Sequence, residues 1–170
     1  MVIDCVQLEK TAAPSHLNLL QNSDFSVAKS NTANYWWTES NLSTGDGRTN
    51  ITTSVADTMD GNVMKMTGAV TSQKRVSQRV DISGSATDVL TLACWGKGYV
   101  PSNETIAYGQ RQFGLRLTFY RSNGTVAGET TALFSPNTEG WQYVAAQAKP
   151  NDAYSYVIVT LLLDYNVGTV

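Results

Sequence analysis

The sequence predicts an all-β domain, an antiparallel β-sandwich of the jelly-roll type. Apolar and polar residues alternate with a period of two along most of the chain, which is typical of strands with one buried face. No stretch of about a dozen residues shows the apolar stripe of an amphipathic helix. The chain has 170 residues, of which 42% are hydrophobic, and this is enough for a single core.

The expected strands follow one another at regular intervals and are separated by turn residues. The run 113–120 shows the alternation most clearly, because its odd-numbered residues are apolar while Arg116 and Tyr120 lie on its other face. It ends at Ser122-Asn123-Gly124, which predicts a hairpin. With the shorter runs included, about eight to ten strands are expected, as in a sandwich or jelly roll. The predicted strands are residues 50–54, 62–67, 73–81, 89–95, 113–120, 125–134, 141–148 and 154–165.

Two polar segments, residues 38–48 and 98–110, are predicted to be loops. Loops of this length often carry a functional surface, although each could equally be a plain connection.

Composition and motifs exclude several classes of function. The net charge of −2 provides no basic surface, so no nucleic-acid partner is expected. No apolar run is long enough to cross a membrane, and no membrane partner is expected. The only histidine, His16, lies in a polar linker, and the nucleophile and phosphate-binding motifs are absent. These observations predict a protein that is not an enzyme.

The two cysteines lie inside apolar runs. Cys5 and Cys94 are therefore expected to be buried thiols, with one disulfide between them as the alternative.

Several short motifs resemble the carbohydrate-binding module superfamily that includes families four, nine, sixteen and twenty-two. Their order along the chain carries the resemblance more than any one of them. The motifs are Asn18-Leu19-Leu20-Gln21-Asn22-Ser23-Asp24-Phe25, Trp36-Trp37-Thr38, Gln78-Arg79-Val80, Cys94-Trp95-Gly96-Lys97-Gly98 and Gly140-Trp141-Gln142. The resemblance implies a jelly roll of the galactose-binding-like type.

The first residues resemble the last strand of such a module rather than its beginning. This predicts a division into a last-strand segment from a preceding module (residues 1–9), a linker (10–16) and a module without its own final strand (17–170). Such arrays resemble the tandem modules of bacterial cell-wall-associated and YD-repeat (Rhs-like) surface proteins, which implies an extracellular or cell-surface location and neighbouring modules as partners. Residues 2–8 are expected to fill the missing strand position, either in their own chain or by strand exchange with a neighbour.

The resemblance implies a non-catalytic carbohydrate-binding or cell-wall adhesion module, with a polysaccharide or cell-wall glycan as partner. The alternative is a structural spacer or protein–protein interaction module without a sugar site. A sugar site needs aromatic surfaces and paired polar groups. The candidates on one open sheet surface are Trp95, Arg116, Tyr120, Gln112 and Gln78, and those from loops are Trp36, Trp37 and Tyr108.

Alternatives stand beside these candidates. A tryptophan in a sandwich is often a core residue, and Trp141 is assigned to the core. Arg116 and Tyr120 could form a plain cross-strand pair on a solvated face.

A structural Ca²⁺ is also implied by the resemblance, with Asp4 and Asp24 as ligands. Cys5 replaces a second aspartate of the family pattern, and the alternative is that Asp24 simply caps a turn.

Overall fold

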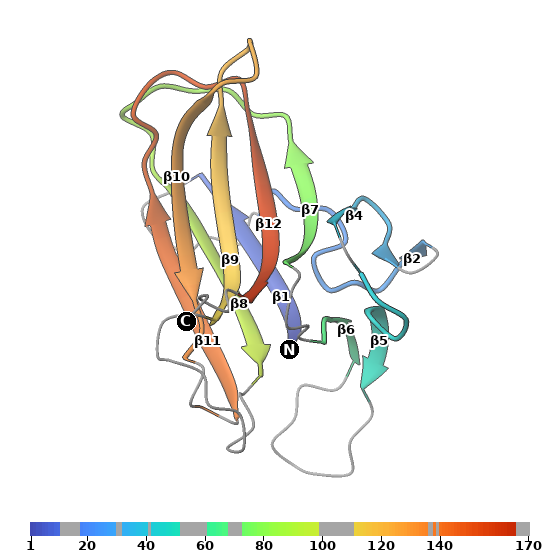
Figure 1. Ribbon diagram of the computed structural model, residues 1–170. Coiled ribbons are helices and arrows are strands. Elements are labelled where there is room, and N and C mark those ends of the chain that lie inside the picture. Colours follow the sequence, from blue (N-terminus) through green and yellow to red (C-terminus); the bar gives the residue numbers. More distant parts are fainter. Residues whose placement is uncertain are drawn as a thin grey trace, which may run out of the picture.

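The computed structural model describes residues 1–10, 18–29, 32–40, 42–51, 61–67, 73–98, 111–135, 138 and 140–165. It confirms the predicted antiparallel β-sandwich (Figure 1). No helix long and apolar enough to cross a membrane is found in these ranges. The strands are β1 (Val2–Glu9), β2 (Ala28–Lys29), β3 (Thr32–Ala33), β4 (Trp37–Ser40), β5 (Gly47–Ile51), β6 (Gly61–Lys65), β7 (Lys74–Val80), β8 (Leu90–Lys97), β9 (Arg111–Tyr120), β10 (Val126–Leu133), β11 (Trp141–Ala148) and β12 (Tyr156–Tyr165).

Ten of these strands form two sheets of five. The first, which we call the β8 sheet, has the order β11-β8-β1-β6-β5, and the second, the β9 sheet, has the order β10-β9-β12-β7-β4. Residues 38–48, predicted to be a loop, instead contain most of β4 and the start of β5. Most of the second predicted loop, residues 99–110, lies outside the described residues.

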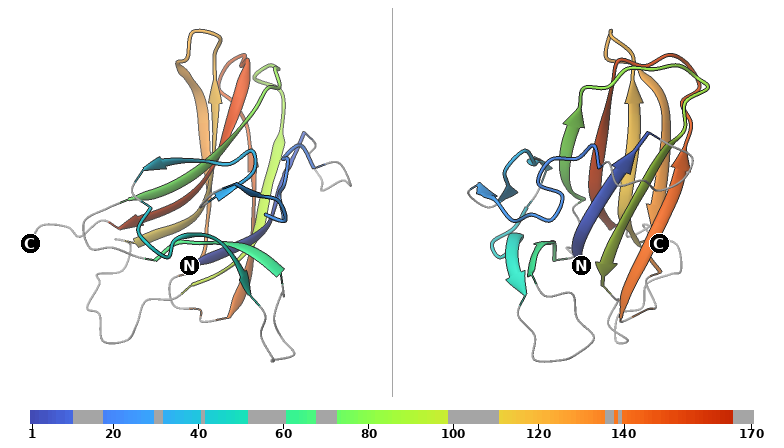
Figure 2. Two further views of the ribbon diagram at one scale, coloured as in Figure 1. Left: turned by 90° about the vertical axis from the view of Figure 1, so that its right-hand side faces the viewer. Right: turned by 180° about the vertical axis from the view of Figure 1, so that it is seen from behind.

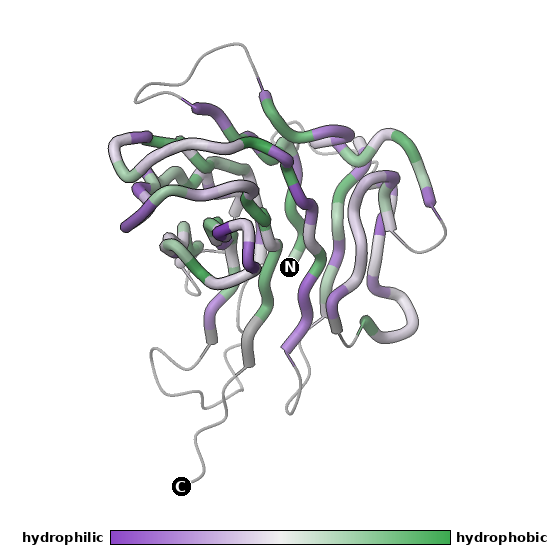
Figure 3. The backbone as a smooth tube through the Cα atoms, turned by 90° about the horizontal axis from the view of Figure 1, so that it is seen from above, coloured by the Kyte–Doolittle hydropathy of each residue, from purple (hydrophilic) through white to green (hydrophobic). Residues whose placement is uncertain are grey.

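The core lies between the inner faces of the two sheets. Alternate residues of the long strands point into it, and Figure 3 shows hydrophobic and hydrophilic segments along both sheets. Burying one Leu, Ile, Val or Phe side chain contributes about 1.5–3 kcal/mol, so this layer is the main source of stability. Its central members, all less than 5% exposed, are Leu92, Cys94, Phe113, Leu115, Leu117, Phe119, Val157, Val159 and Leu161.

β1 is a central strand of the β8 sheet. It pairs antiparallel with β8 over most of its length and with β6 at its start, where Ile3 lies opposite Gly96 and Met64 (Figure 2). A bulge between Asp4 and Gln7 shifts the register, and Cys5 in this bulge has a φ of 48°. Residues 2–9 therefore pair within their own chain, while the division of the chain into pieces of two modules stays a prediction.

The segment that begins at Asn18 covers the free edge of β1. The Asn18 side chain bonds both the N–H of Leu8 (3.0 Å) and the carbonyl of Val6 (2.8 Å). Leu19 N–H donates to the Leu8 carbonyl (2.8 Å), and Val6 N–H donates to the Ser23 carbonyl (3.1 Å). The second half of β1 thus has hydrogen-bond partners on both edges.

The two cysteines do not form a disulfide. Cys94 is buried on the inner face of β8, as expected for a small apolar residue. Cys5 is exposed, and the expectation that it is buried was wrong because the bulge in β1 takes its side chain out of the core.

A buried ion pair joins β7 to the turn before β5. Lys74 Nζ lies 2.5 Å from Asp46 Oδ2 and 3.0 Å from Ser43 Oγ, and the two charged side chains are at most 1% exposed. Burial acts to raise the pKa of Asp46, but Lys74 and the N–H groups of Ser43 and Thr67 outweigh it, so this pKa lies below its usual value. The stabilisation from Asp46 is therefore present above its ordinary pKa near 3.8 and is lost as the pH falls through its lowered folded-state pKa.

Replacing Lys74 by methionine should be strongly destabilising, because it leaves the Asp46 carboxylate buried without its cation. We expect Lys74→Met to lower the free energy of unfolding by about 3–5 kcal/mol in urea denaturation at pH 7. Adding Asp46→Asn should recover part of the loss, because it removes the unpaired buried charge while its one amide oxygen can still accept from either Ser43 or Thr67. Lys65→Met, at an exposed position of β6, is the control; equal effects of Lys74→Met and Lys65→Met would contradict this account.

The polar face as candidate functional site

The outer face of the β9 sheet carries a dense set of polar and aromatic side chains, which we call the polar face. These residues alternate along their strands with the inner residues that form the core. The polar face consists of Trp37 and Glu39 on β4, Ser77 and Arg79 on β7, Tyr156 and Thr160 on β12, Arg116, Thr118 and Tyr120 on β9, and Glu129 on β10.

A row of directly opposed residues crosses this face from β4 to β9. Trp37 lies opposite Ser77, Ser77 opposite Thr160, and Thr160 opposite Arg116. The Ser77 hydroxyl donates to the Glu39 carboxylate and shares a hydrogen bond of 2.9 Å with Thr160. The strands are thus joined by side-chain hydrogen bonds in addition to the backbone ladder.

The far end of the row is an ion pair. Arg116 Nε lies 3.4 Å from Glu129 Oε1, and Thr118 Oγ1 donates to Glu129 Oε2 over 3.2 Å. Both charged side chains remain partly open to solvent.

Three side chains form a stack beside this row. The guanidinium carbon of Arg79 lies 3.8 Å from the ring centroid of Tyr156, and the Tyr156 and Tyr120 rings are 5.0 Å apart and inclined by 7°. Because the two rings face each other across neighbouring strands, they direct their edges away from the sheet. Burial, and then the negative charge of Glu39, raise the pKa of Tyr120 above its ordinary value of 10.0.

Four of the predicted site residues lie on this outer face. Arg116, Tyr120 and Trp37 belong to the polar face, and Gln112 is exposed on β9 at the same parity. Trp37 is 39% exposed.

Trp95 does not join them, and the prediction of one shared surface was wrong. It lies on β8 in the other sheet, where its ring is 5.4 Å from that of Tyr143. Trp141, expected in the core, is half-buried and has the same parity as Tyr143, so it also lies on the outer face of the β8 sheet.

Gln78 and Trp36 were also predicted to line the sugar site, and this was wrong because both side chains point inward. Gln78 is 3% exposed, and its amide accepts from Gln21 N–H and donates to the Gln21 carbonyl, both over 2.8 Å. Trp36 is 2% exposed, packs on Phe25 and donates to the Asn22 carbonyl. The remaining candidate, Tyr108, lies outside the described residues.

Seven of the ten residues of the polar face were not among the predicted site residues: Glu39, Ser77, Arg79, Tyr156, Thr160, Thr118 and Glu129. Parity along the run 154–165 places Tyr156 on the solvent side and was an available signal. The strand containing Glu39 was predicted to be a loop, so its parity could not be used.

The predicted calcium ligands lie near the bulge of β1. Asp4 is 6% exposed and accepts from Cys5 N–H (2.7 Å), while Asp24 is exposed and accepts from Ser26 N–H (3.1 Å), as a turn cap does. Among the described residues no three His, Cys, Asp or Glu side chains gather as a metal site would require. Two carboxylates alone do not fit Ca²⁺, which takes six to eight oxygens, and the calcium site stays a prediction.

Comparison with known proteins identifies one structural similarity. No protein-family model matches the chain, and no curated protein sequence matches it. A solved structure of the enzymatically active domain of tailspike protein 4 from bacteriophage CBA120 is similar, with a TM-score of 0.55 and 14% sequence identity. The similarity covers 89% of this chain but only 20% of the tailspike chain, and it shows a shared fold.

This similarity contradicts the sequence-based prediction that the chain is not an enzyme. The absence of a familiar catalytic motif was the basis of that prediction, yet the similar structure is an enzymatically active domain. The fold therefore gives no ground for excluding catalysis.

The stability of the chain should respond to the charge of Asp4. Burial raises the pKa of Asp4, and the Asp24 carboxylate adds to this, so the stability associated with Asp4 is greatest below the ordinary pKa of 3.8 and falls as the pH rises above it. We expect Asp4→Asn, which keeps the acceptor for Cys5 N–H, to raise the thermal unfolding midpoint at pH 7 in a chelating buffer.

The same variant tests calcium. If Asp4 binds Ca²⁺, the ion raises the midpoint of the wild type and leaves that of Asp4→Asn unchanged. A lower midpoint for Asp4→Asn in chelator would contradict the electrostatic argument, and a calcium response unaffected by the substitution would exclude Asp4 as a ligand.

Proposed function

We propose that this chain is a polysaccharide-binding module of a larger extracellular protein, and that the glycan lies across the polar face. The observation that carries the proposal is the combination, on one sheet surface, of the Arg79–Tyr156–Tyr120 stack with the row from Trp37 to Arg116.

The chemistry of the polar face suits a sugar chain. Saccharides present hydroxyl groups that pair with charged or amide side chains, and apolar C–H faces that pack on aromatic rings. The tyrosine hydroxyls, Arg116 and Glu129 supply the polar partners, and the exposed ring of Trp37 supplies the apolar one. From β4 to β9 the row spans three strand spacings, roughly 14 Å, and the groups open to a sugar chain lie at its two ends, because Ser77 and Thr160 between them are buried.

The comparison supports the fold on which the proposal rests, since a domain of a phage tailspike shares it over most of this chain. A shared fold does not identify a ligand, so the proposal depends on the side chains of the polar face.

Glycan processing is a second candidate function. Two carboxylates, those of Glu39 and Glu129, lie on the polar face, and both contribute to raising the pKa of Tyr120. Glycoside hydrolysis usually uses two carboxylates on either side of the scissile bond, and these two come from β4 and β10, the edge strands of the sheet. Release of reducing ends from any bound polysaccharide, lost in both Glu39→Gln and Glu129→Gln, would support this candidate.

A glycan array tests the proposal with variants on opposite faces of the sandwich. We expect Trp37→Ala and Tyr120→Phe to weaken binding by about tenfold each, which corresponds to roughly 1.4 kcal/mol. Trp95→Ala, which removes an exposed aromatic ring from the β8 sheet, is the matched control and should bind like the wild type.

Three results would contradict the proposal in different ways. Loss of binding in Trp95→Ala alone would place the site on the β8 sheet. Binding unaffected by all three substitutions would exclude the polar face. No binding by the folded wild type to any glycan would favour the structural spacer.

A further inference from the structure

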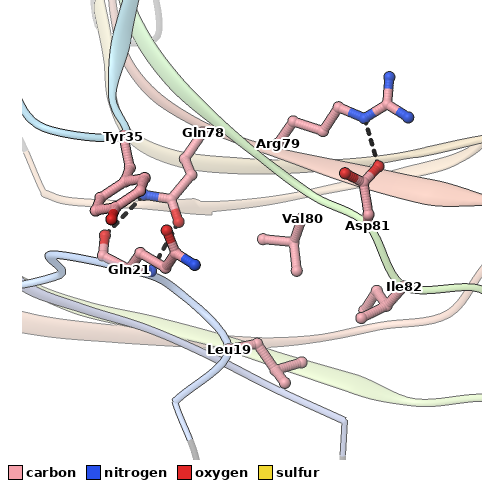
Figure 4. A pocket seen from close by; sticks show the side chains of 8 residues that line it. All are labelled: Leu19, Gln21, Tyr35, Gln78, Arg79, Val80, Asp81 and Ile82. Atoms are coloured by element: carbon pink, nitrogen blue, oxygen red, sulfur yellow. Dashed lines mark hydrogen bonds and ion pairs between the residues drawn. The ribbon is translucent and has the colours of Figure 1, made fainter.

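A pocket of about 490 Å³ opens at the edge of the β9 sheet, beside the polar face (Figure 4). Its size is within the range of pockets that bind small molecules. It is lined by Leu19, Gln21, Tyr35, Gln78, Arg79, Val80, Asp81 and Ile82.

The pocket exists because β4 covers only part of β7. The β4–β7 ladder begins at the pair Trp37–Ser77, so β4 does not extend along the later residues of β7. The segment carrying Leu19 and Gln21 lies there instead, held by the two hydrogen bonds of the Gln78 amide. Since the same segment is fixed to β1 through Asn18, its distance from β7 is set by the core rather than by the pocket.

The lining has an aliphatic floor and a polar rim. Leu19, Val80 and Ile82 form the floor, and the side chains of Tyr35 and Gln21 stand at the rim in Figure 4. Among the described residues, no hydrogen bond involves the Tyr35 hydroxyl or the side-chain amide of Gln21, so both can serve a ligand.

Tyr35 is held in an unusual position. Its φ of 70° lies in the left-handed region, which a bulky residue adopts only when its surroundings impose it, and its side chain is nevertheless 55% exposed. The unusual backbone conformation therefore leaves the Tyr35 ring exposed at the mouth of the pocket.

The charges at the pocket are balanced. Arg79 Nε lies 2.7 Å from Asp81 Oδ1, so the pair offers no net charge to a ligand. A neutral ligand with one apolar face and several hydroxyl groups matches this combination of floor, rim and charge.

We propose that the pocket binds a single neutral hexopyranose residue, as the end or side branch of the glycan that crosses the polar face. This inference rests on the proposed function. The connection is Arg79, which lines the pocket and also lies over the Tyr156 ring of the polar face.

An extended peptide added to the edge of β7 is the other conceivable occupant. It needs a straight row of open backbone groups. Here the chain turns at the end of β7, with Ile82 N–H donating to the Val80 carbonyl over 3.0 Å, and the Gln21 backbone is bonded to Gln78. The edge therefore does not present the ladder that a peptide strand requires.

The test is a titration of the full chain, with labelled Leu, Val and Ile methyl groups, followed by NMR. The probes are glucose, galactose, mannose and N-acetylglucosamine, each added separately. We expect at least one to shift the methyl signals of Leu19, Val80 and Ile82 in a saturable way, with a Kd of about 1 mM, as is usual for so small a ligand.

Two variants locate the effect. Tyr35→Ala should weaken monosaccharide binding about fivefold or more without unfolding the chain, because this side chain is largely exposed. Tyr120→Phe, on the polar face, is the control and should leave monosaccharide binding unchanged while it weakens polysaccharide binding.

The outcomes separate this inference from the proposed function. If a polysaccharide binds but no monosaccharide produces saturable methyl shifts, the pocket inference is overturned and the proposed function stands. Monosaccharide binding at the pocket without polysaccharide binding would support the pocket and overturn the role of the polar face. Shifts caused by an unstructured peptide but by none of the sugars would also overturn the inference.

Discussion

The position of β1 in the middle of the β8 sheet is the constraint on which the rest of the structure depends. Without it, β8 and β6 have no common neighbour, and the sheet divides into two pairs of strands. Ile3, Val6 and Leu8 are all completely buried, and together they contribute roughly 5–9 kcal/mol of hydrophobic stabilisation. A domain of this size is stable by only about 5–15 kcal/mol, so the first strand accounts for a large part of what holds the chain folded.

The positions of both candidate sites depend on β1. β1 fixes the segment from Asn18 to Gln21, and the backbone of Gln21 in turn fixes the Gln78 amide, which sets the width of the pocket. β7 links the pocket to the polar face, because its residues alternate between an inward Gln78 and an outward Arg79. The scaffold is tightly packed where it faces the core and presents polar groups at its outer surface, as ligand binding requires.

The sequence was sufficient to predict the strands but not their arrangement. Alternation predicted residues 141–148 with the same bounds as β11, and it predicted the core row of β9. Local alternation does not say which sheet a strand joins, so Trp95 was grouped with Arg116 although they lie on opposite sheets. Trp36 lies in the core, whereas its neighbour Trp37 is exposed. This difference depends on the direction of strand β4, which the sequence analysis did not recognise. The prediction that the chain is not an enzyme failed for another reason. It relied on the absence of known catalytic motifs, whereas this fold also occurs in an enzymatically active domain that is only 14% identical in sequence.

Removal of residues 1–9 tests the central role of β1 most directly. Urea unfolding, followed by tryptophan fluorescence, would compare the full chain with the shortened one, alone and with a synthetic peptide of residues 1–10. We predict that the shortened chain lacks a cooperative transition and that the peptide restores one, because the vacant position between β8 and β6 is specific for this strand. A shortened chain that unfolds cooperatively at the same urea concentration as the full chain would contradict the account.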